Sequence, residues 1–370
     1  MISLVAANRL LYRAHVPKSI AEQAFQRVHK PGTALADQLL LSKADVNAMS
    51  SLAERISPLN QPLWGFISPL ILYTLRAVLV FLWLCAKACS QPQQLQVPCF
   101  FIFGDSLVDN GNNNRILTLA RANYRPYGID FPQGATGRFT NGRTYVDALA
   151  QLLGFPNYIP PYERTRGPAL IRGVNYASGA SGIRDETGTN LGDHTSMNRQ
   201  VANFASTVQE MRRFFRGNNN SLNSHLSKCI FYSGMGSNDY LNNYFMPDFY
   251  SSSSDFTVQA YAAALLQDYS RQLTQLYTLG ARKVIVTAVG QIGCIPYQLA
   301  RYHGNSSRCN EKINTAVSLF NTGLRKLVDI FNGGQLPGAK FVYLDSYQST
   351  SDLYLNASNY GNLLCTHIQP

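Results

Sequence analysis

The sequence predicts an α/β fold in which a parallel sheet carries helices on both faces. Three observations predict it: short apolar runs of strand type recur after residue 91, helical patterns lie between them, and glycines end those helical patterns. The length of 370 residues and the apolar content of 45% allow one substantial core. We therefore expect one main domain preceded by an appendage.

The predicted strands are four short, unbroken apolar runs, which are typical of strands buried on both faces of a parallel sheet. They occupy residues 99–103, 229–232, 284–286 and 341–344. Helical patterns at residues 258–279 and 312–331 end at Gly280 and at Gly333-Gly334. In such sheets ligands bind beyond the carboxyl ends of the strands, so the residues after each run are the candidate site residues.

The segment ahead of the predicted domain contains an apolar run, AVLVFLWLCA, at residues 77–86, between Arg76 and several small residues. This pattern is typical of a secretory signal peptide, and the run is short for a membrane span of about 20 residues. Residues 64–90 therefore predict secretion; a signal anchor or a buried helix is the alternative. Membrane contact is expected only through this segment, if it is not cleaved. Residues 1–63 form an unplaced N-terminal extension, whose deletion should leave the fold intact.

The composition and the motifs of the sequence argue against several classes of partner and cofactor. The net charge is +11, but only 14% of residues are charged and no basic cluster tracks phosphates, so no nucleic-acid partner is expected. Seven cysteines fit a few disulfides in an oxidising compartment. Without a CxxC pair or a His/Cys cluster at metal spacing, no metal is expected. Without a P-loop or GxGxxG after the first strand, no nucleotide or flavin cofactor is expected.

A candidate nucleophile follows the first predicted strand at once, in Gly104-Asp105-Ser106. A serine at a strand-to-helix turn projects into the crevice, where backbone N–H groups of the next turn favour negative charge; a helix N-cap is the alternative. Gly179 and Asn238 follow two further segments of strand type and offer a backbone N–H and a side-chain amide as oxyanion donors. Each alone also fits a polar turn, but together they indicate acyl transfer.

Several longer blocks occur in a fixed order along the chain. They are FIFGDSLVDNGNN (101–113), GRFTNGR (137–143), GVNYASGASGI (173–183), GSNDYLNNY (236–244), GQIGCIPYQ (290–298) and RCN (308–310). Through them the chain resembles the plant-type GDSL esterase/lipase family of the SGNH hydrolase superfamily, from about residue 97 to residue 361. The resemblance implies a flavodoxin-like three-layer α/β/α sandwich and a carboxylic-ester hydrolase that acts on lipid or other acyl esters without a cofactor or metal.

The resemblance also implies roles for particular residues. Ser106 matches the nucleophile, and its own N–H matches one oxyanion donor, with Gly179 and Asn238 as the others. Asp105 and Asp109 match positions that shape the nucleophile turn. The resemblance further implies a disulfide between Cys294 and Cys309, whereas it gives Cys99 and Cys229 no partner.

The family's base and its orienting acid come from a late Asp-x-x-His block, and this spacing occurs nowhere in the sequence. None of the six histidines has that context: His15, His29, His194, His225, His303 and His367. We therefore expect residues 91–361 to form an incomplete SGNH-hydrolase-like domain with a missing C-terminal segment, followed by a divergent tail at 362–370.

Such a chain is expected to be a weak esterase or none, and a form continuing past Gly361 is expected to be competent. The alternative is a non-catalytic protein of the same fold that binds acyl or glycan esters, or a remnant. If the chain is exported, the sequons at Asn219, Asn305 and Asn356 are candidate glycosylation sites.

Overall fold

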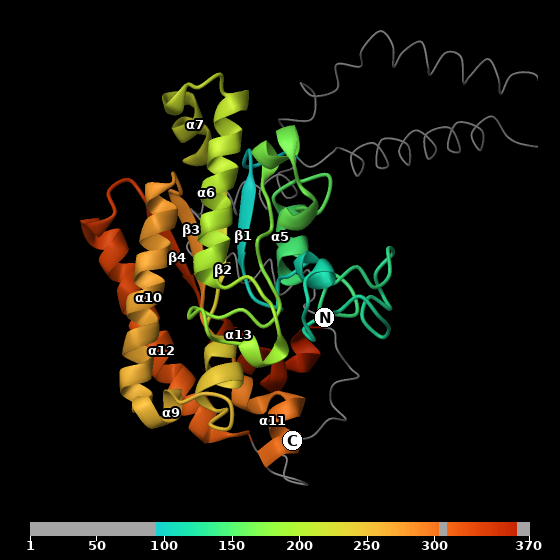
Figure 1. Ribbon diagram of the computed structural model, residues 1–370, viewed down its shortest axis with the longest axis vertical. Helices are drawn as coiled ribbons and strands as arrows, with labels where there is room; N and C mark the ends of the chain where they lie inside the picture. Colours follow the sequence, from blue (N-terminus) through green and yellow to red (C-terminus); the bar gives the residue numbers. More distant parts are fainter. Residues whose placement is uncertain (1–93, 303–308, 361–370) are drawn as a thin grey trace, which may run out of the picture. The chain divides into compact units, whose positions relative to one another are not determined.

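The computed structural model describes residues 94–302 and 309–360 of the chain (Figure 1). The predictions made for residues 1–63, 64–90 and 362–370, and for Asn305, lie outside these ranges. No helix in the described ranges combines the length and the apolarity that crossing a membrane requires.

Four parallel strands form the sheet in the described part of the chain, in the order β1, β2, β3, β4. They are β1 (Phe100–Gly104), β2 (Ile230–Gly234), β3 (Lys283–Thr287) and β4 (Lys340–Leu344). Each predicted apolar run is therefore a strand. The four strands are paired without stagger, so that Gly104, Gly234, Thr287 and Leu344 lie level with one another. We call the side of the sheet where these residues lie the carboxyl edge.

A further extended segment, residues 174–178, runs parallel to β1 on the side away from β2. The Ile102 N–H donates to the Val174 carbonyl (3.0 Å), and the Tyr176 and Ser178 N–H groups donate to Ile102 and Gly104 (2.8 and 3.1 Å). This segment makes β1 an interior strand and gives the spatial order of a flavodoxin-like doubly wound sheet. It also delivers Gly179 to the carboxyl edge.

Helices cover both faces of the sheet. Successive residues of β1 point to opposite faces, and both sets are buried against helices. Phe101 and Phe103 enter the larger core cluster, with residues from the helices α6 (Met197–Phe214), α10 (Val258–Thr278) and α12 (Glu311–Ile330). Phe100 and Ile102 enter a smaller cluster with residues of α5 (Tyr145–Leu152). Figure 1 shows α6 and α10 lying along the sheet. The result is the predicted three-layer α/β/α sandwich.

The longer helices are α5 (Tyr145–Leu152), α6 (Met197–Phe214), α7 (Asn219–Leu226), α10 (Val258–Thr278), α12 (Glu311–Ile330) and α13 (Ser346–Leu355). Shorter helical segments are α8 (Ser237–Asp239), α9 (Ser252–Asp255) and α11 (Pro296–Tyr302). The helical patterns predicted at 258–279 and 312–331 are α10 and α12. As predicted, α10 ends before a glycine, Gly280, whose φ of +114° stops the helix.

Candidate active site

The structure brings the predicted nucleophile and the two predicted oxyanion donors to the carboxyl edge. Ser106 follows β1, Gly179 follows the segment 174–178, and Asn238 follows β2. Gly104 is level with Gly234 on β2, and its carbonyl accepts from the Ser178 N–H. Three segments that are distant in the sequence therefore end side by side, as a parallel sheet requires.

The nucleophile turn is held by its own aspartate. The side chain of Asp105 accepts from the Leu107 N–H (2.9 Å), and its carbonyl accepts from the N–H groups of Val108 and Asp109 (3.2 and 3.0 Å). Ser106 is half-buried, and neither its Oγ nor its N–H has a hydrogen-bond partner among the described residues. Since a capping serine accepts from a backbone N–H of the first turn, Ser106 is not an N-cap in this structure.

The end of β1 has little room, which explains the glycine before the turn. A Cβ at Gly104 would lie 2.5 Å from Cγ2 of Val108 and 3.2 Å from the Gly234 carbonyl oxygen. The side chain of Gln200, on α6, accepts from the Gly104 N–H (3.0 Å) and donates to its carbonyl (2.8 Å). Gln200 therefore fixes the base of the nucleophile turn; the sequence analysis missed it, because its contact depends on how α6 packs.

Gly179 is held by a buried carboxylate. The Gly179 N–H donates to Oδ2 of Asp109 (3.0 Å), while Oδ1 accepts from the N–H groups of Gly111 and Asn112 (both 2.8 Å). Burial raises the pKa of Asp109 to about 6, although the backbone N–H groups oppose that rise. The predicted oxyanion donor is thus engaged by Asp109 in this structure. The next N–H, that of Ala180, has no partner among the described residues, and Ala180 has a φ of +66°.

Asn238 lies in α8, close to the loop that follows Gly179. One N–H of its side-chain amide donates to the Ser181 carbonyl (2.9 Å), and its Oδ1 accepts from the Asn242 amide (2.7 Å). These contacts fix the amide plane and leave the second N–H of Nδ2 without a partner among the described residues. Asn238 therefore has a hydrogen-bond donor to offer to a ligand.

The neighbouring Asp239 holds the loop that contains Ser181. Its carboxylate accepts from the N–H groups of Ile183 and Arg184 (2.9 and 3.1 Å) and from the Thr187 hydroxyl (2.8 Å). Burial raises the pKa of Asp239 to about 6. Burial also raises the pKa of Asp105 to about 7, with a further rise from the charges of Asp239 and Asp109. Three buried carboxyl groups thus organise the backbone of the site.

Asn113 is a second residue that the sequence analysis did not single out. Its amide donates to the carbonyls of Gly179 (3.0 Å) and Ala120 (2.9 Å), and its Oδ1 accepts from the Ser178 hydroxyl (2.6 Å). Gly179 is therefore fixed on both sides, by Asp109 at its N–H and by Asn113 at its carbonyl. The only available signal was its place in the GNN stretch after the nucleophile turn.

Two of the six histidines, His194 and His225, lie in the described part of the chain. The buried His194 has its Nδ1 3.3 Å from the Gly192 carbonyl and lines a hollow with Asp185, Asp193 and Arg199. Neither of these two histidines forms a hydrogen bond with Ser106. Among the described residues, the nucleophile therefore has no imidazole base in contact.

Two disulfides are present in the described residues. Cys294 and Cys309 are bonded (Cα–Cα 4.4 Å), as the resemblance implied. Cys99 and Cys229, for which no partner was predicted, are also bonded (Cα–Cα 4.7 Å). They immediately precede β1 and β2, and their adjacency follows from the pairing of those strands. This disulfide lies at the end of the sheet opposite Ser106.

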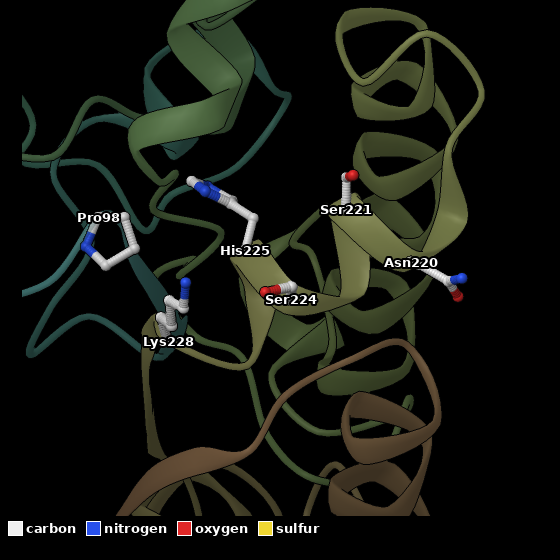
Figure 2. Close-up of a pocket in the computed structure, with 6 residues that line it drawn as sticks. All are labelled: Pro98, Asn220, Ser221, Ser224, His225 and Lys228. Atoms are coloured by element: carbon white, nitrogen blue, oxygen red, sulfur yellow. The ribbon is translucent and has the colours of Figure 1, made fainter.

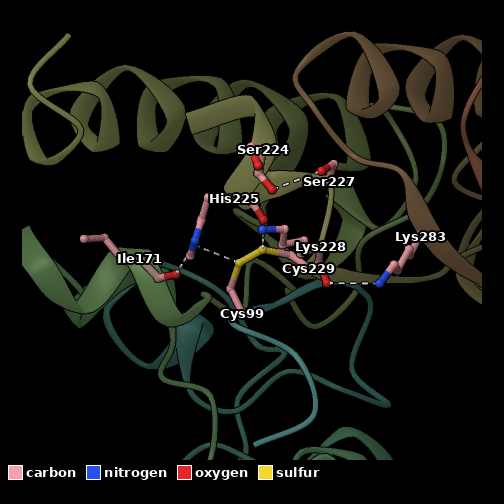
Figure 3. The surroundings of a disulfide bond; sticks show 8 residues. All are labelled: Cys99, Ile171, Ser224, His225, Ser227, Lys228, Cys229 and Lys283. Atoms are coloured by element: carbon pink, nitrogen blue, oxygen red, sulfur yellow. Dashed lines mark hydrogen bonds between the residues drawn. A yellow bond between two sulfur atoms is a disulfide. The ribbon is translucent and has the colours of Figure 1, made fainter. Parts of the chain in front are cut away.

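His225 lies beside this disulfide, with its Nε2 3.2 Å from Sγ of Cys99 and 3.0 Å from the Ile171 carbonyl (Figure 3). Cys99, Cys229 and His225 thus form a His/Cys cluster that the sequence analysis did not expect. A thiolate is needed to bind zinc, and here both sulfurs are bonded to each other. A shallow pocket beside the cluster is lined by Pro98, Asn220, Ser221, Ser224, His225 and Lys228 (Figure 2).

Comparison with known proteins agrees with this geometry. The model of the family described as GDSL-like Lipase/Acylhydrolase matches residues 100–362. The Arabidopsis thaliana protein GDSL esterase/lipase At1g33811 is 71% identical over 276 residues, which cover 74% of this chain and 75% of that protein. GDSL esterase/lipase At5g45670, from the same plant, is 53% identical over 264 residues, covering 71% and 72%. The chain therefore belongs to the GDSL-like lipase/acylhydrolase family.

Proposed function

We propose that this chain is a carboxylic-ester hydrolase whose nucleophile is Ser106. The observation that carries the proposal is the position of Ser106, which lies at the carboxyl edge with both its hydroxyl and its N–H free of partners among the described residues. Membership of the family supports the reaction class.

In the proposed reaction, Oγ of Ser106 attacks the ester carbonyl carbon, and its proton passes to solvent water as the new C–O bond forms. The carbonyl oxygen becomes an oxyanion, which accepts from the Ser106 N–H and from the free N–H of Asn238. The Gly179 N–H joins them when Asp109 releases it. The tetrahedral intermediate expels the alcohol, which takes up a proton, and water then hydrolyses the acyl-enzyme to release the acid and restore Ser106.

The reaction needs a base to accept the Ser106 proton, and the residues that the structure describes do not provide one in contact with Ser106. The sequence contains no Asp-x-x-His, and no described histidine contacts Ser106. Since removal of triad members lowers turnover by several orders of magnitude while an oxyanion hole retains some, we expect weak turnover. The second candidate is a non-catalytic protein of the same fold that binds acyl or glycan esters, and it is favoured by the absence of a contacting imidazole among the described residues alone.

The proposed setting is the secretory pathway. Two disulfides among the described residues support an oxidising compartment, and the apolar run at 77–86 supports export. Asn219 and Asn356 are exposed, as a glycan acceptor must be, and Asn305 is a third candidate. The proposed ligand is a lipid or other small acyl ester, with no nucleic-acid partner and with membrane contact only through 64–90.

A fluorophosphonate probe tests the nucleophile, because it reacts with an activated serine. We expect slow labelling that maps to the peptide containing Ser106, is lost in Ser106→Ala and is retained in Ser224→Ala, a change of an exposed serine at the opposite end of the sheet. Labelling that persists in Ser106→Ala would refute the assignment. Absent labelling together with saturable ester binding supports the non-catalytic candidate, whereas Ser106-dependent turnover at ordinary enzyme rates would refute the expected weakness.

A further inference from the structure

An aromatic side chain packs directly on the backbone of Gly179. A Cβ at this glycine would lie 2.6 Å from Cζ and 2.9 Å from Cε2 of Phe139. The Phe139 ring therefore occupies the space that any side chain at position 179 would need. Since Gly179 is at the carboxyl edge, an apolar surface begins beside the place where the ester carbonyl is proposed to bind.

Two further rings extend this surface. The Phe139 and Tyr127 rings meet edge to face, with centroids 5.9 Å apart, and the Tyr127 and Tyr124 rings do the same at 5.3 Å. Phe139 and Tyr127 are half-buried, whereas Tyr124 is 55% exposed. We call these three side chains the aromatic ledge. It runs from Gly179 to solvent.

The loop next to Gly179 adds exposed aliphatic side chains. Leu117 and Leu119 are 87% and 79% exposed. Their backbone is nevertheless fixed, because the Leu119 N–H donates to the Leu191 carbonyl (2.7 Å) and the Leu117 carbonyl accepts from the Asp193 N–H (2.8 Å). The carbonyl of the following residue, Ala120, accepts from the same Asn113 amide that holds Gly179.

This placement of apolar groups is informative. Single exposed leucines are common on protein surfaces, but several exposed apolar side chains on a hydrogen-bonded backbone beside a polar site indicate a binding surface. Five exposed large apolar side chains fall within residues 107–129 of the described chain: Leu107, Leu117, Leu119, Tyr124 and Ile129. Aromatic rings offer flat apolar area, and the tyrosine hydroxyls reach water at its rim.

We propose that the aromatic ledge binds the aliphatic acyl chain of the ester, with its carbonyl at Ser106, and that Phe139 and Tyr127 set the preference for long over short acyl groups. The proposal rests on the proposed function of Ser106. The occupant is an aliphatic chain because the ledge begins at Gly179 and continues through apolar rings, whereas an acetyl group would end before reaching Tyr127.

The test measures binding separately from turnover. In Ser106→Ala, calorimetry gives the Kd of p-nitrophenyl acetate, butyrate, hexanoate and octanoate. We expect each added methylene to tighten binding by up to about fourfold, which corresponds to about 0.8 kcal/mol per buried CH₂. Adding Phe139→Ala, Tyr127→Ala or Tyr124→Ala should flatten this dependence. Tyr127→Phe, which keeps the ring, and Phe214→Ala, at the far end of α6, should preserve it.

Two outcomes would refute the proposal that the aromatic ledge binds the acyl chain. One is a Kd that does not change with acyl length, and the other is a chain-length dependence that survives both Phe139→Ala and Tyr124→Ala. Tyr124 is largely exposed, so its replacement tests the ledge even where Phe139→Ala fails to fold. The two proposals fail separately, because the assay needs no nucleophile. Loss of Ser106 labelling with the chain-length dependence intact would refute the nucleophile alone.

Discussion

The Gly179 N–H donates to the Asp109 carboxylate, 3.0 Å away, across a sequence separation of 70 residues. This bond connects the nucleophile turn to the segment that runs beside β1, and it orders the backbone of the site before any ester binds. Its cost is that a buried acidic group faces a region where negative charge is proposed to develop. The raised pKa of Asp109, about 6, reduces that cost when the carboxyl is protonated.

Asp109→Asn tests this connection. The amide places an NH₂ group or an oxygen at each former carboxylate position, so at least one of the three backbone N–H donors loses its acceptor. We expect a loss of about 1–3 kcal/mol in the free energy of unfolding, typical of a buried donor left unpaired. Urea unfolding measures the loss. The control is Asp130→Asn, an exposed site, and equal stability of the two variants would contradict the expectation.

The buried carboxyl groups also predict a pH dependence. Burial holds the pKa of Asp105 at about 7 in the folded chain, against about 4 when unfolded. Between these values the folded chain binds the extra proton, so its stability falls as pH rises from about 4 to about 7. We expect the free energy of unfolding of the native sequence, relative to Asp105→Asn, to decrease through this window in urea titrations. A difference that stays constant with pH would show that Asp105 is ionised throughout.

The pair Arg138 and Asp147 is a buried ion pair, with side chains 8% and 2% exposed and with N–O distances of 2.6 and 3.0 Å. We expect Arg138→Met to cost about 3–5 kcal/mol, because it leaves a buried carboxylate unpaired. Removing the exposed partner of Asp193, in Arg199→Met, should cost about 0–1 kcal/mol.

The double variant Arg138→Met/Asp147→Leu removes both buried charges. It therefore separates the cost of an unpaired charge from the cost of changed packing. It should regain most of the stability that Arg138→Met loses. Chemical denaturation compares all four chains. A loss in Arg138→Met no larger than that in Arg199→Met would show that Asp147 is satisfied without Arg138.

Removing each of the two disulfides should lower the free energy of unfolding by a different amount. Chain entropy increases with the loop that is closed, so for separations of 130 and 15 residues the expected contributions are about 5 and about 3 kcal/mol. We expect Cys99→Ala/Cys229→Ala to unfold at lower urea than Cys294→Ala/Cys309→Ala under non-reducing conditions. The reverse order would indicate that the first bond constrains the unfolded chain little.

The sheet was predictable where strands are unbroken apolar runs, and all four runs are strands. The segment 174–178 was expected to be of strand type but was not among the four apolar runs, because its sequence, VNYAS, mixes apolar, polar and small residues; its place beside β1 and a short loop was therefore not predicted. Its position depends on tertiary contacts, such as the bond from the Ser178 N–H to Gly104. Such contacts join residues that are distant in the sequence, so a local sequence pattern does not predict them.

The candidate site was predictable in its residues but not in its contacts. Ser106, Gly179 and Asn238 could be found because each follows a segment that ends at the same side of a parallel sheet. The hydrogen bond from the Gly179 N–H to Asp109 could not be predicted, because it depends on the path of the turn after Ser106. The bond between Cys99 and Cys229 required knowing that β1 and β2 are neighbours.

The level pairing of the four strands has a consequence for how such proteins diversify. Because every named strand has five residues and all stop together, the loops that follow them can change in length without shifting any strand. The stretch that carries Tyr124, Tyr127 and Phe139 is one of these loops. Exchanging it between relatives should therefore transplant acyl preference as a module, while the recipient keeps its own sheet and its own serine.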